Sequence, residues 1–429
     1  MRKERNLLEG PLLSNIILYT VPIILTSVLQ LLFNAADLVV VGRFCGSLSV
    51  AAVGAGVAVA HAIGSRETEW VHRTVHTALP MALVCGAVVT ALGVGLSGTL
   101  LQRMGTPEDI LALSGRYMKI YFSGITFTMI YNFCAAILRA AGDTRSPLIY
   151  LTFAGAVNVV LNVVFVTVFD MNVAGVALAT IISQGISAAL VLRALMKRTD
   201  ACRLELKKVR FYRAQMGKII RIGLPAGIQS SMFSISNVLI QSSVNSFGAI
   251  FVSGNAAAMN IEGFLFVSLN AFHQTAVNFI GQNAGARHYD RVKKILGICC
   301  ACVTVCGIAL GTAMWSMGPK LLSLYITDSA EAIAHGMVRM TFMALPYFLC
   351  GLMDVTTGAL RGLGVSFIPM LISILGVCGI RILWVATIFQ IPGFHTPQCL
   401  YISYTVSWTV TLICQAIAFL LVYRRHRAQ

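Results

Sequence analysis

Long apolar stretches recur along the whole chain, and each is close to the length that crosses a lipid bilayer. About 20 apolar residues rising ~1.5 Å each span the hydrocarbon core, so the pattern predicts a series of transmembrane α-helices. The first stretch, residues 13–43, follows an N-terminus without a small-residue cleavage site, and we expect it to be retained. The further predicted spans are residues 48–64, 77–101, 117–138, 147–169, 173–196, 219–247, 252–280, 295–317, 337–359, 367–389 and 400–423.

A polar, basic stretch at residues 197–218 divides the chain into halves of similar length that resemble each other. Short motifs recur in the same order, and each half contains six apolar stretches, so both repeats start on the same side of the membrane. We therefore predict two six-helix lobes, 1–196 and 219–429, related by a pseudo-two-fold axis and joined by a cytoplasmic linker at 197–218. The matched pairs include Pro22 and Pro225, Asn34 and Asn237, Arg66 and Arg287, Arg139 and Arg361, and Gly142 and Gly364.

The second apolar stretch, residues 48–64, is shorter than its counterpart in the second half. The numbering offset between matched motifs of the two halves increases by about 18 residues between Ala55 and Gly64. The first half therefore lacks about 18 residues there, close to one span of ~20 residues. Because the charge pattern still requires this stretch to cross, we predict a shortened second helix with a locally thinned bilayer. One of the twelve predicted helices is therefore truncated.

Composition and charge agree with a membrane protein. Of the 429 residues 57% are hydrophobic and 11% are charged, and the mean hydropathy is +0.80, so we predict an all-α polytopic membrane protein. Most of the 32 Lys and Arg fall on the side of the N-terminus, as the positive-inside rule requires of cytoplasmic loops. We expect a multi-pass protein of the cell (inner) membrane with both termini cytoplasmic, whose net charge of +16 reflects topology and not nucleic-acid binding. The basic residues assigned to the outer side are Arg43, Arg103, Arg116, Lys119, Lys320 and Arg339, and Arg381 falls within a span.

The first span carries polar side chains that are unusual in hydrocarbon. Gln30, Asn34 and Asp37 are spaced to share one helical face, and a mid-membrane carboxylate costs about 3 kcal/mol even on mild scales. We therefore predict that this face lines a polar cavity in which Asp37 binds a cation or a proton. The alternative is that Asp37 lies at the outer membrane interface near Arg43 and has no binding role.

Further candidates lie in other spans. Glu262 and Asp354 are predicted in the wall of a substrate cavity, because carboxylates inside membranes are usually functional; for Glu262 the alternative is a structural polar network. Arg381 needs a partner, and the sequence does not choose between these two carboxylates. Tyr131 is a candidate cavity residue that would contact cationic substrates through its ring. The twelve cysteines show no metal-ligand spacing, and no metal site is predicted.

Several motifs resemble those of the multidrug and toxic compound extrusion (MATE) antiporters of prokaryotes. They are LLFNAADLVVVGRF, ILRAAGDTRSP, GQNAGARHYDRV and LRGLG. The resemblance implies twelve helices in two lobes around a central cavity. It also implies that Asp37, Asn158, Asn162 and Thr180 bind the coupling ion. Asn162 stands where the family often has aspartate, which leaves Asp37 as the one proton carrier of this site and lowers the expected Na⁺ affinity.

The resulting hypothesis is a secondary antiporter that exports small organic, cationic compounds in exchange for H⁺ or Na⁺. No cofactor and no catalytic residue is predicted, because the sixteen acidic residues are scattered without an Asp-rich pair typical of intramembrane enzymes. Two alternatives stay open: a flippase for lipid-linked sugars or lipids, which would have a more cationic cavity, and a truncated homologue that no longer transports. We expect a monomer in the lipid bilayer that binds small molecules and no nucleic acid.

Overall fold

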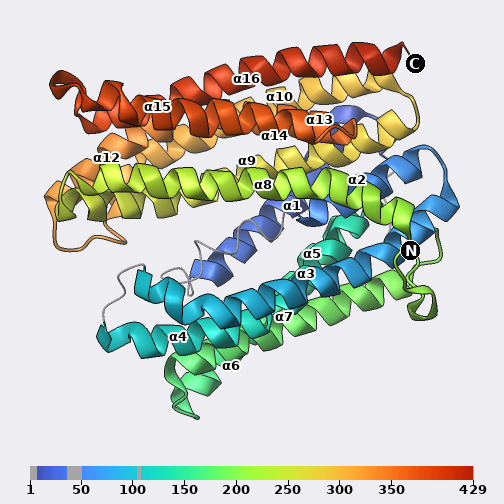
Figure 1. Ribbon diagram of the computed structural model, residues 1–429, viewed down its shortest axis with the longest axis horizontal. Coiled ribbons are helices and arrows are strands. Elements are labelled where there is room, and N and C mark those ends of the chain that lie inside the picture. Colours follow the sequence, from blue (N-terminus) through green and yellow to red (C-terminus); the bar gives the residue numbers. More distant parts are fainter. Residues whose placement is uncertain (1–6, 36–50, 104–107, 429) are drawn as a thin grey trace. The chain divides into compact units, whose positions relative to one another are not determined.

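The computed structural model of the protein describes residues 7–35, 51–103 and 108–428 (Figure 1). This described part is helical, with turns between the helices and no β-strand. Eight of its helices are long and apolar enough to cross a bilayer alone, and two bent helix pairs each pass the same test together. With the short α2 and the long but less apolar α8, these make the twelve predicted helices. The prediction of an all-α membrane protein is therefore confirmed.

The helices form two compact units, and the first contains the described residues between 32 and 224. In it α6 packs along α7, while α5 contacts α2, α3 and α7. Helix α8, Arg213–Asn245, begins in this unit and continues into the second. The other helices of the first unit are α2 (Ala51–Gly64), α3 (Thr68–Arg103), α4 (Glu108–Ser123), α5 (Ile125–Ala140), α6 (Arg145–Thr167), α7 (Asn172–Met196) and the 3-10 turn η1 (Leu206–Lys208).

The second unit contains residues 7–31 and the described residues from 225 onward. Its helices α9 and α13 pack along each other, and α10 and α12 also contact α9. It includes most of α1 (Leu12–Ala35), then α9 (Ala249–Gly285), α10 (Tyr289–Ser316), α11 (Gly318–Leu322), α12 (Ala330–Met343), α13 (Tyr347–Gly362), α14 (Phe367–Ser373), the π-helical η2 (Ile374–Gly379), α15 (Ile380–Ala386), the 3-10 turns η3 (Ile388–Gln390) and η4 (Pro392–Phe394), and α16 (Pro397–Arg427).

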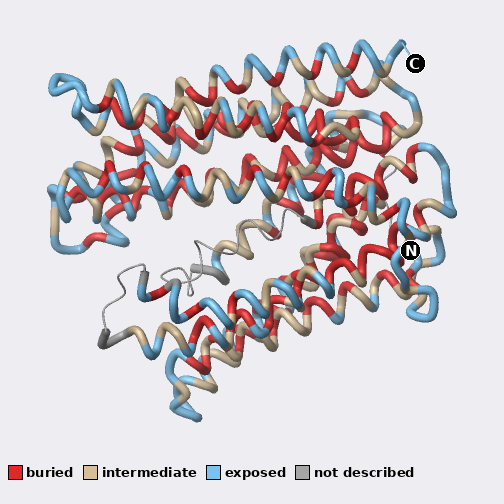
Figure 2. Tube along the Cα trace, viewed as in Figure 1, coloured by how far each residue is buried: buried red, intermediate tan, exposed pale blue. Residues whose placement is uncertain are grey.

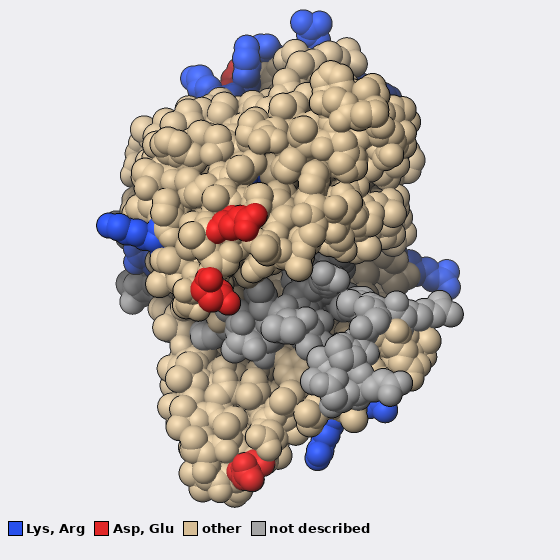
Figure 3. All heavy atoms as spheres, turned by 90° about the vertical axis from the view of Figure 1, so that its left-hand side faces the viewer, with Lys and Arg blue, Asp and Glu red and all other residues tan. Residues whose placement is uncertain are grey.

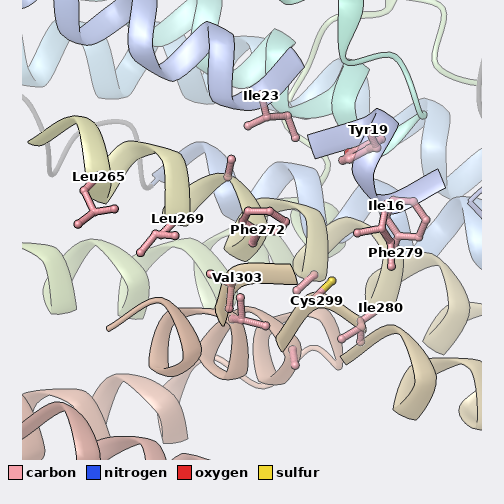
Figure 4. Close-up of a cluster of buried hydrophobic side chains, with 14 of the residues drawn as sticks. Ile16, Tyr19, Ile23, Leu265, Leu269, Phe272, Phe279, Ile280, Cys299 and Val303 are labelled. Atoms are coloured by element: carbon pink, nitrogen blue, oxygen red, sulfur yellow. The ribbon is translucent and has the colours of Figure 1, made fainter. Parts of the chain in front are cut away.

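Helix α1 lies in the core of the second unit, whereas the sequence assigned it to the lobe 1–196. Ile16, Tyr19 and Ile23 are fully buried in a cluster with side chains of α9 and α10 (Figure 4). The rings of Tyr19 and Phe279 meet edge to face at 5.2 Å. Apolar contact to α9 thus outweighs proximity in sequence for this helix. The predicted lobes differ from the compact units at this point and stay a prediction about the membrane architecture.

The basic linker predicted at 197–218 belongs to the first unit. The backbone N–H of Glu205 donates to Nε2 of His76 at 2.9 Å, and that of Tyr212 donates to Oγ1 of Thr77 at 3.3 Å. The ammonium of Lys218 lies 5.1 Å from the centre of the Trp70 ring. These polar contacts fix the linker against the start of α3.

The predicted shortening of the second helix falls partly on residues 36–50, which lie outside the described residues. Helix α2 has 14 described residues directly after that gap, and α9, which holds the matching position in the second half, has 37. The length of the second helix therefore stays a prediction. The predicted thinning of the bilayer around it stays a prediction.

Backbone geometry supports the internal repeat. Arg66 and Arg287 both have left-handed φ angles, 58° and 59°, directly after α2 and α9. Gly142 and Gly364 have φ of 90° and 84° after α5 and α13. The two bent pairs, α4–α5 at 42° and α12–α13 at 46°, also correspond. Left-handed residues of this kind end helices, so the two halves end equivalent helices in the same way.

Apolar side chains cover much of the helix surface. Figure 2 shows exposed positions along the length of the helices, not only at their ends. Phe153 and Val160 on α6, and Leu421 on α16, are each more than half exposed. Large apolar side chains exposed along whole helices are expected of a surface in contact with lipid and not water.

Close packing of α9 on α12 gives a first prediction. A Cβ at Gly254 would meet the carbonyl oxygen of Ala332, with the backbone nitrogen of Gly336 only 2.9 Å away. Gly254→Ala is therefore expected to lower the free energy of unfolding by about 1–3 kcal/mol, the usual cost of overpacking. The measurement is thermal unfolding of the purified protein in detergent. The matched control is Gly297→Ala in α10, where a Cβ meets nothing within 4 Å and stability should hold or rise.

Candidate ion site and buried polar clusters

Three of the four predicted ion-site residues form a hydrogen-bonded chain in the first unit. Nδ2 of Asn158 donates to Oγ1 of Thr180 at 3.3 Å, and Nδ2 of Asn162 donates to Oδ1 of Asn158 at 3.0 Å. Oγ1 of Thr180 donates in turn to the carbonyl oxygen of Val176 at 3.0 Å. The two asparagines are one helical turn apart on α6, and Thr180 faces them from α7, because the two helices pack antiparallel.

One oxygen of this cluster accepts no hydrogen bond from the described residues. Oδ1 of Asn162 is buried, and no donor in the described part of the chain reaches it. Leaving a buried acceptor unpaired costs about 1–3 kcal/mol, so such an atom needs an explanation. An amide oxygen is a ligand for a hard cation and an acceptor for a protonated carboxyl. Asp37, the fourth predicted residue, lies outside the described residues.

Glu262 forms an ion pair inside the second unit, with a partner that was not predicted from the sequence. Nε and Nη2 of Arg339 donate to the two carboxylate oxygens of Glu262 at 2.9 and 2.7 Å. Nη1 of Arg339 donates to Oδ1 of Asn255, which also accepts from the Tyr401 hydroxyl. Both charged side chains are less than 10% exposed.

The sequence counted Arg339 among the basic residues of the outer side, and its burial was not predicted. It lies inside α12 and points to Glu262 of α9. A buried guanidinium needs groups that compensate its charge, and the spacing of the sequence does not reveal which residues supply them. This ion pair agrees with the alternative considered for Glu262, a structural polar network, and the role of Glu262 stays a prediction.

Asp354 on α13 belongs to a second polar cluster of the same unit. Its carboxylate receives a hydrogen bond from Asn270, and its carbonyl oxygen lies 2.7 Å from Nδ1 of His273. Since a carbonyl only accepts, Nδ1 of His273 carries a proton, and Nε2 faces Nη1 of Arg361 at 3.4 Å as an acceptor. Nη2 of Arg361 donates to Gln229 at 2.8 Å. Arg361, close to the end of α13, is only 5% exposed.

Neither carboxylate is the partner of Arg381. Its guanidinium lies over the Tyr404 ring at 3.9 Å and over the Trp408 ring at 5.6 Å, and Nε donates to the Ser407 hydroxyl at 2.9 Å. Aromatic faces of α16 therefore stabilise this charge through cation–π contacts. The contact of Arg381 with these two aromatic rings was not predicted, because only carboxylates were considered as its partners.

The remaining predicted cavity residues differ in how far their side chains are buried. Tyr131 on α5 is fully buried and its hydroxyl donates to the carbonyl oxygen of Pro147, so no surface of its ring is exposed to a cavity. Gln30 is half-buried on α1. Asn34 belongs to α1, but its side chain lies outside what the structure describes. Among the described residues no group of three or more His, Cys, Asp or Glu side chains is arranged to hold a metal ion.

Long apolar helices with buried polar clusters define a multi-pass membrane protein, and comparison with known proteins gives its family. The MatE family model matches residues 54–164 and 225–387, more than half of the chain, and the chain belongs to this family of transporters, which is not a class of enzymes.

Relatives and solved structures match nearly the whole length. The probable multidrug resistance protein YpnP of Bacillus subtilis is 27% identical over 404 residues, covering 88% of this chain and 89% of that protein. The probable multidrug resistance protein NorM of Thermotoga maritima is 24% identical over 383 residues, covering 83% and 81%. A MOP superfamily transporter from Pyrococcus furiosus has the same fold, with a TM-score of 0.89, 20% identity and coverage of 100% and 99%. A MATE structure in complex with MaL6 gives a TM-score of 0.86 at 20% identity, again covering 100% and 99%.

Proposed function

We propose that the protein exports small organic cations across the cell membrane in exchange for an ion bound by Asp37, Asn158, Asn162 and Thr180. The observation that carries the proposal is the buried Oδ1 of Asn162, which ends a hydrogen-bonded chain and accepts no hydrogen bond from any described residue. The names of curated relatives such as YpnP, a probable multidrug resistance protein, support the efflux of drugs.

The charges of this site favour a proton over Na⁺. Asn158, Asn162 and Thr180 offer neutral oxygens, so Asp37 would supply the one formal negative charge. Hard cations bind more tightly as the number of charged ligands rises, whereas a proton needs one carboxylate and one acceptor for its hydrogen bond. Oδ1 of Asn162 is such an acceptor.

The charges of the second unit do not favour Glu262 as a cation-binding residue. Its carboxylate is neutralised by Arg339 in a two-bond pair, and both groups are buried. Asp354 is half-buried and therefore the better candidate for contact with a cationic substrate.

A second candidate function is export of an anionic compound, such as a lipid-linked sugar phosphate. The observation in its favour is that the second unit buries Arg339, Arg361 and Arg381, whereas the sequence placed only Arg381 within a span. Against it, these three guanidinium groups are engaged by Glu262, Gln229 and the Tyr404 ring, respectively.

The orientation with both termini in the cytoplasm is part of the proposal. In the view of Figure 3 most visible side chains of the described residues are uncharged, a few are carboxylates, and Lys and Arg lie mainly near the margins. A face poor in Lys and Arg is expected on the outer side of an inner membrane.

The test is efflux of a fluorescent organic cation from proteoliposomes under a proton gradient or a sodium gradient imposed separately. We expect the proton gradient to drive efflux, and Asn162→Ala to raise the proton concentration for half-maximal rate by about two- to tenfold, since it removes the acceptor for the carboxyl proton and a hydrogen bond between neutral groups contributes about 0.5–1.5 kcal/mol. Asn245→Ala, an exposed asparagine at the end of α8, is the matched control. Equal rates with and without either gradient would overturn ion coupling, and transport of only anionic probes would favour the second candidate.

A further inference from the structure

A cavity of about 550 Å³ lies in the first unit, apart from the proposed ion site. It is formed where α5 ends, α6 begins and α7 ends, together with the loop after α7. Its polar side chains are Asp143, Tyr150, Arg193, Lys197, Arg198, Thr199 and Asp200. Cavities of this size hold small molecules or the polar headgroup of a larger one.

The carboxylates of this cavity are already engaged by neighbouring groups. Asp143 accepts from the backbone N–H of Ser146 at 2.9 Å and from the Ser146 hydroxyl, which fixes the start of α6. Asp200 accepts from Nε and Nη2 of Arg198 at 2.8 and 2.6 Å, and from the backbone N–H of Cys202. The Arg198 side chain is only 7% exposed. Both acidic groups therefore serve local structure.

The remaining charge of the cavity is positive. Arg193 and Lys197 are one helical turn apart at the end of α7, both are exposed, and no ion pair of either is found among the described residues. Two like charges on one helical face repel each other unless an anion lies between or beside them. A phosphate group, which accepts several charge-assisted hydrogen bonds, is the ligand that such a pair of cations suits.

The surroundings of the cavity indicate a ligand with an apolar part. Leu138, Leu190 and Ala194 form its apolar wall. On α6, Ile149 and Phe153 stand beside Tyr150 in sequence and are 56% and 55% exposed, as side chains in contact with lipid would be. Headgroup pockets lined with basic residues at the ends of membrane helices bind anionic lipids in this way.

We propose that this cavity binds the phosphate of an anionic phospholipid, with Arg193 and Lys197 as its cationic ligands and the acyl chains along the apolar face of α6. Arg198 positions the loop through Asp200 and is not counted as a ligand. The site is independent of the transport proposal, because it contains none of the residues assigned to the coupling ion.

The experiment measures binding of a fluorescent short-chain phosphatidylglycerol to the purified full-length protein in detergent, with phosphatidylcholine of the same chain length as the uncharged reference. The variants are Arg193→Gln with Lys197→Gln and, as matched control, Lys293→Gln with Lys294→Gln, two exposed lysines of α10. Each cation near an anionic headgroup contributes about fivefold in affinity, so the double variant should lose about tenfold or more. The control should stay within about twofold, as surface charges without a site do.

Three results would overturn the proposal. The first is equal affinity for both lipids in the unchanged protein. The second is an equal loss in the two double variants, which would indicate attraction without a site. The third is that glycerol phosphate displaces the labelled lipid as effectively as unlabelled phosphatidylglycerol does. That result would assign the cavity to a soluble phosphate compound. Retention of the unchanged elution volume in size-exclusion chromatography shows that each variant is folded.

Discussion

Arg339→Met is expected to lower the free energy of unfolding by about 3–5 kcal/mol, the usual result of removing one partner from a buried ion pair. The substitution leaves the Glu262 carboxylate without its two hydrogen bonds at a site less than 10% exposed to solvent. Methionine fills a similar volume, so the loss comes from the unpaired charge and not from a cavity. The measurement is the thermal unfolding midpoint of the purified protein in detergent, followed by intrinsic fluorescence.

Two controls separate the buried pair from charge in general. Arg427→Met removes a guanidinium that lies 3.5 Å from Asp290 with both side chains more than 60% exposed, and such surface pairs contribute about 0–1 kcal/mol. Glu262→Met together with Arg339→Met removes both charges and should recover much of the lost stability. If the single variant unfolds at the temperature of the Arg427 variant, or if the double variant is no more stable than the single one, the pair does not have the role assigned to it.

Asp37→Asn is expected to abolish ion-coupled efflux, with a fall of at least about tenfold in the gradient-driven rate and loss of its dependence on pH. The reason is a charge count: Asn158, Asn162 and Thr180 supply neutral oxygens, and an amide at position 37 would leave the proposed site without a group that gains or loses a proton at physiological pH. The measurement is efflux of the fluorescent cation from proteoliposomes at several external pH values.

The matched control is Asp170→Asn in the turn between α6 and α7. Asp170 is exposed and has a φ of 48°, a conformation that asparagine adopts readily, so its fold and transport should not change. Coupled efflux by Asp37→Asn with the pH dependence of the unchanged protein would exclude Asp37 as the proton carrier. It would favour the alternative in which this residue lies at the outer membrane interface.

Local sequence features predicted much of the secondary structure and of the ion site. Runs of apolar residues require helices in a membrane, because backbone polar groups must be satisfied within the segment itself. The repeat followed from ordered motifs, and the matched φ angles at Gly142 and Gly364 show that these motifs mark helix ends. Asn158 and Asn162 lie one turn apart on a single helix, so their proximity is also a local property. Thr180 joins them because α6 and α7 are consecutive and antiparallel.

By itself, the sequence determined the all-helical membrane fold and the one-turn spacing of Asn158 and Asn162 in the candidate ion site. Only the tertiary structure decided that α1 packs on α9, that Glu262 pairs with Arg339, and that Arg381 lies over Tyr404 and Trp408. Each of these depends on contacts between helices distant in sequence. Helical periodicity states which residues share a face, but which helix covers that face depends on side-chain packing and charge pairing across the whole unit.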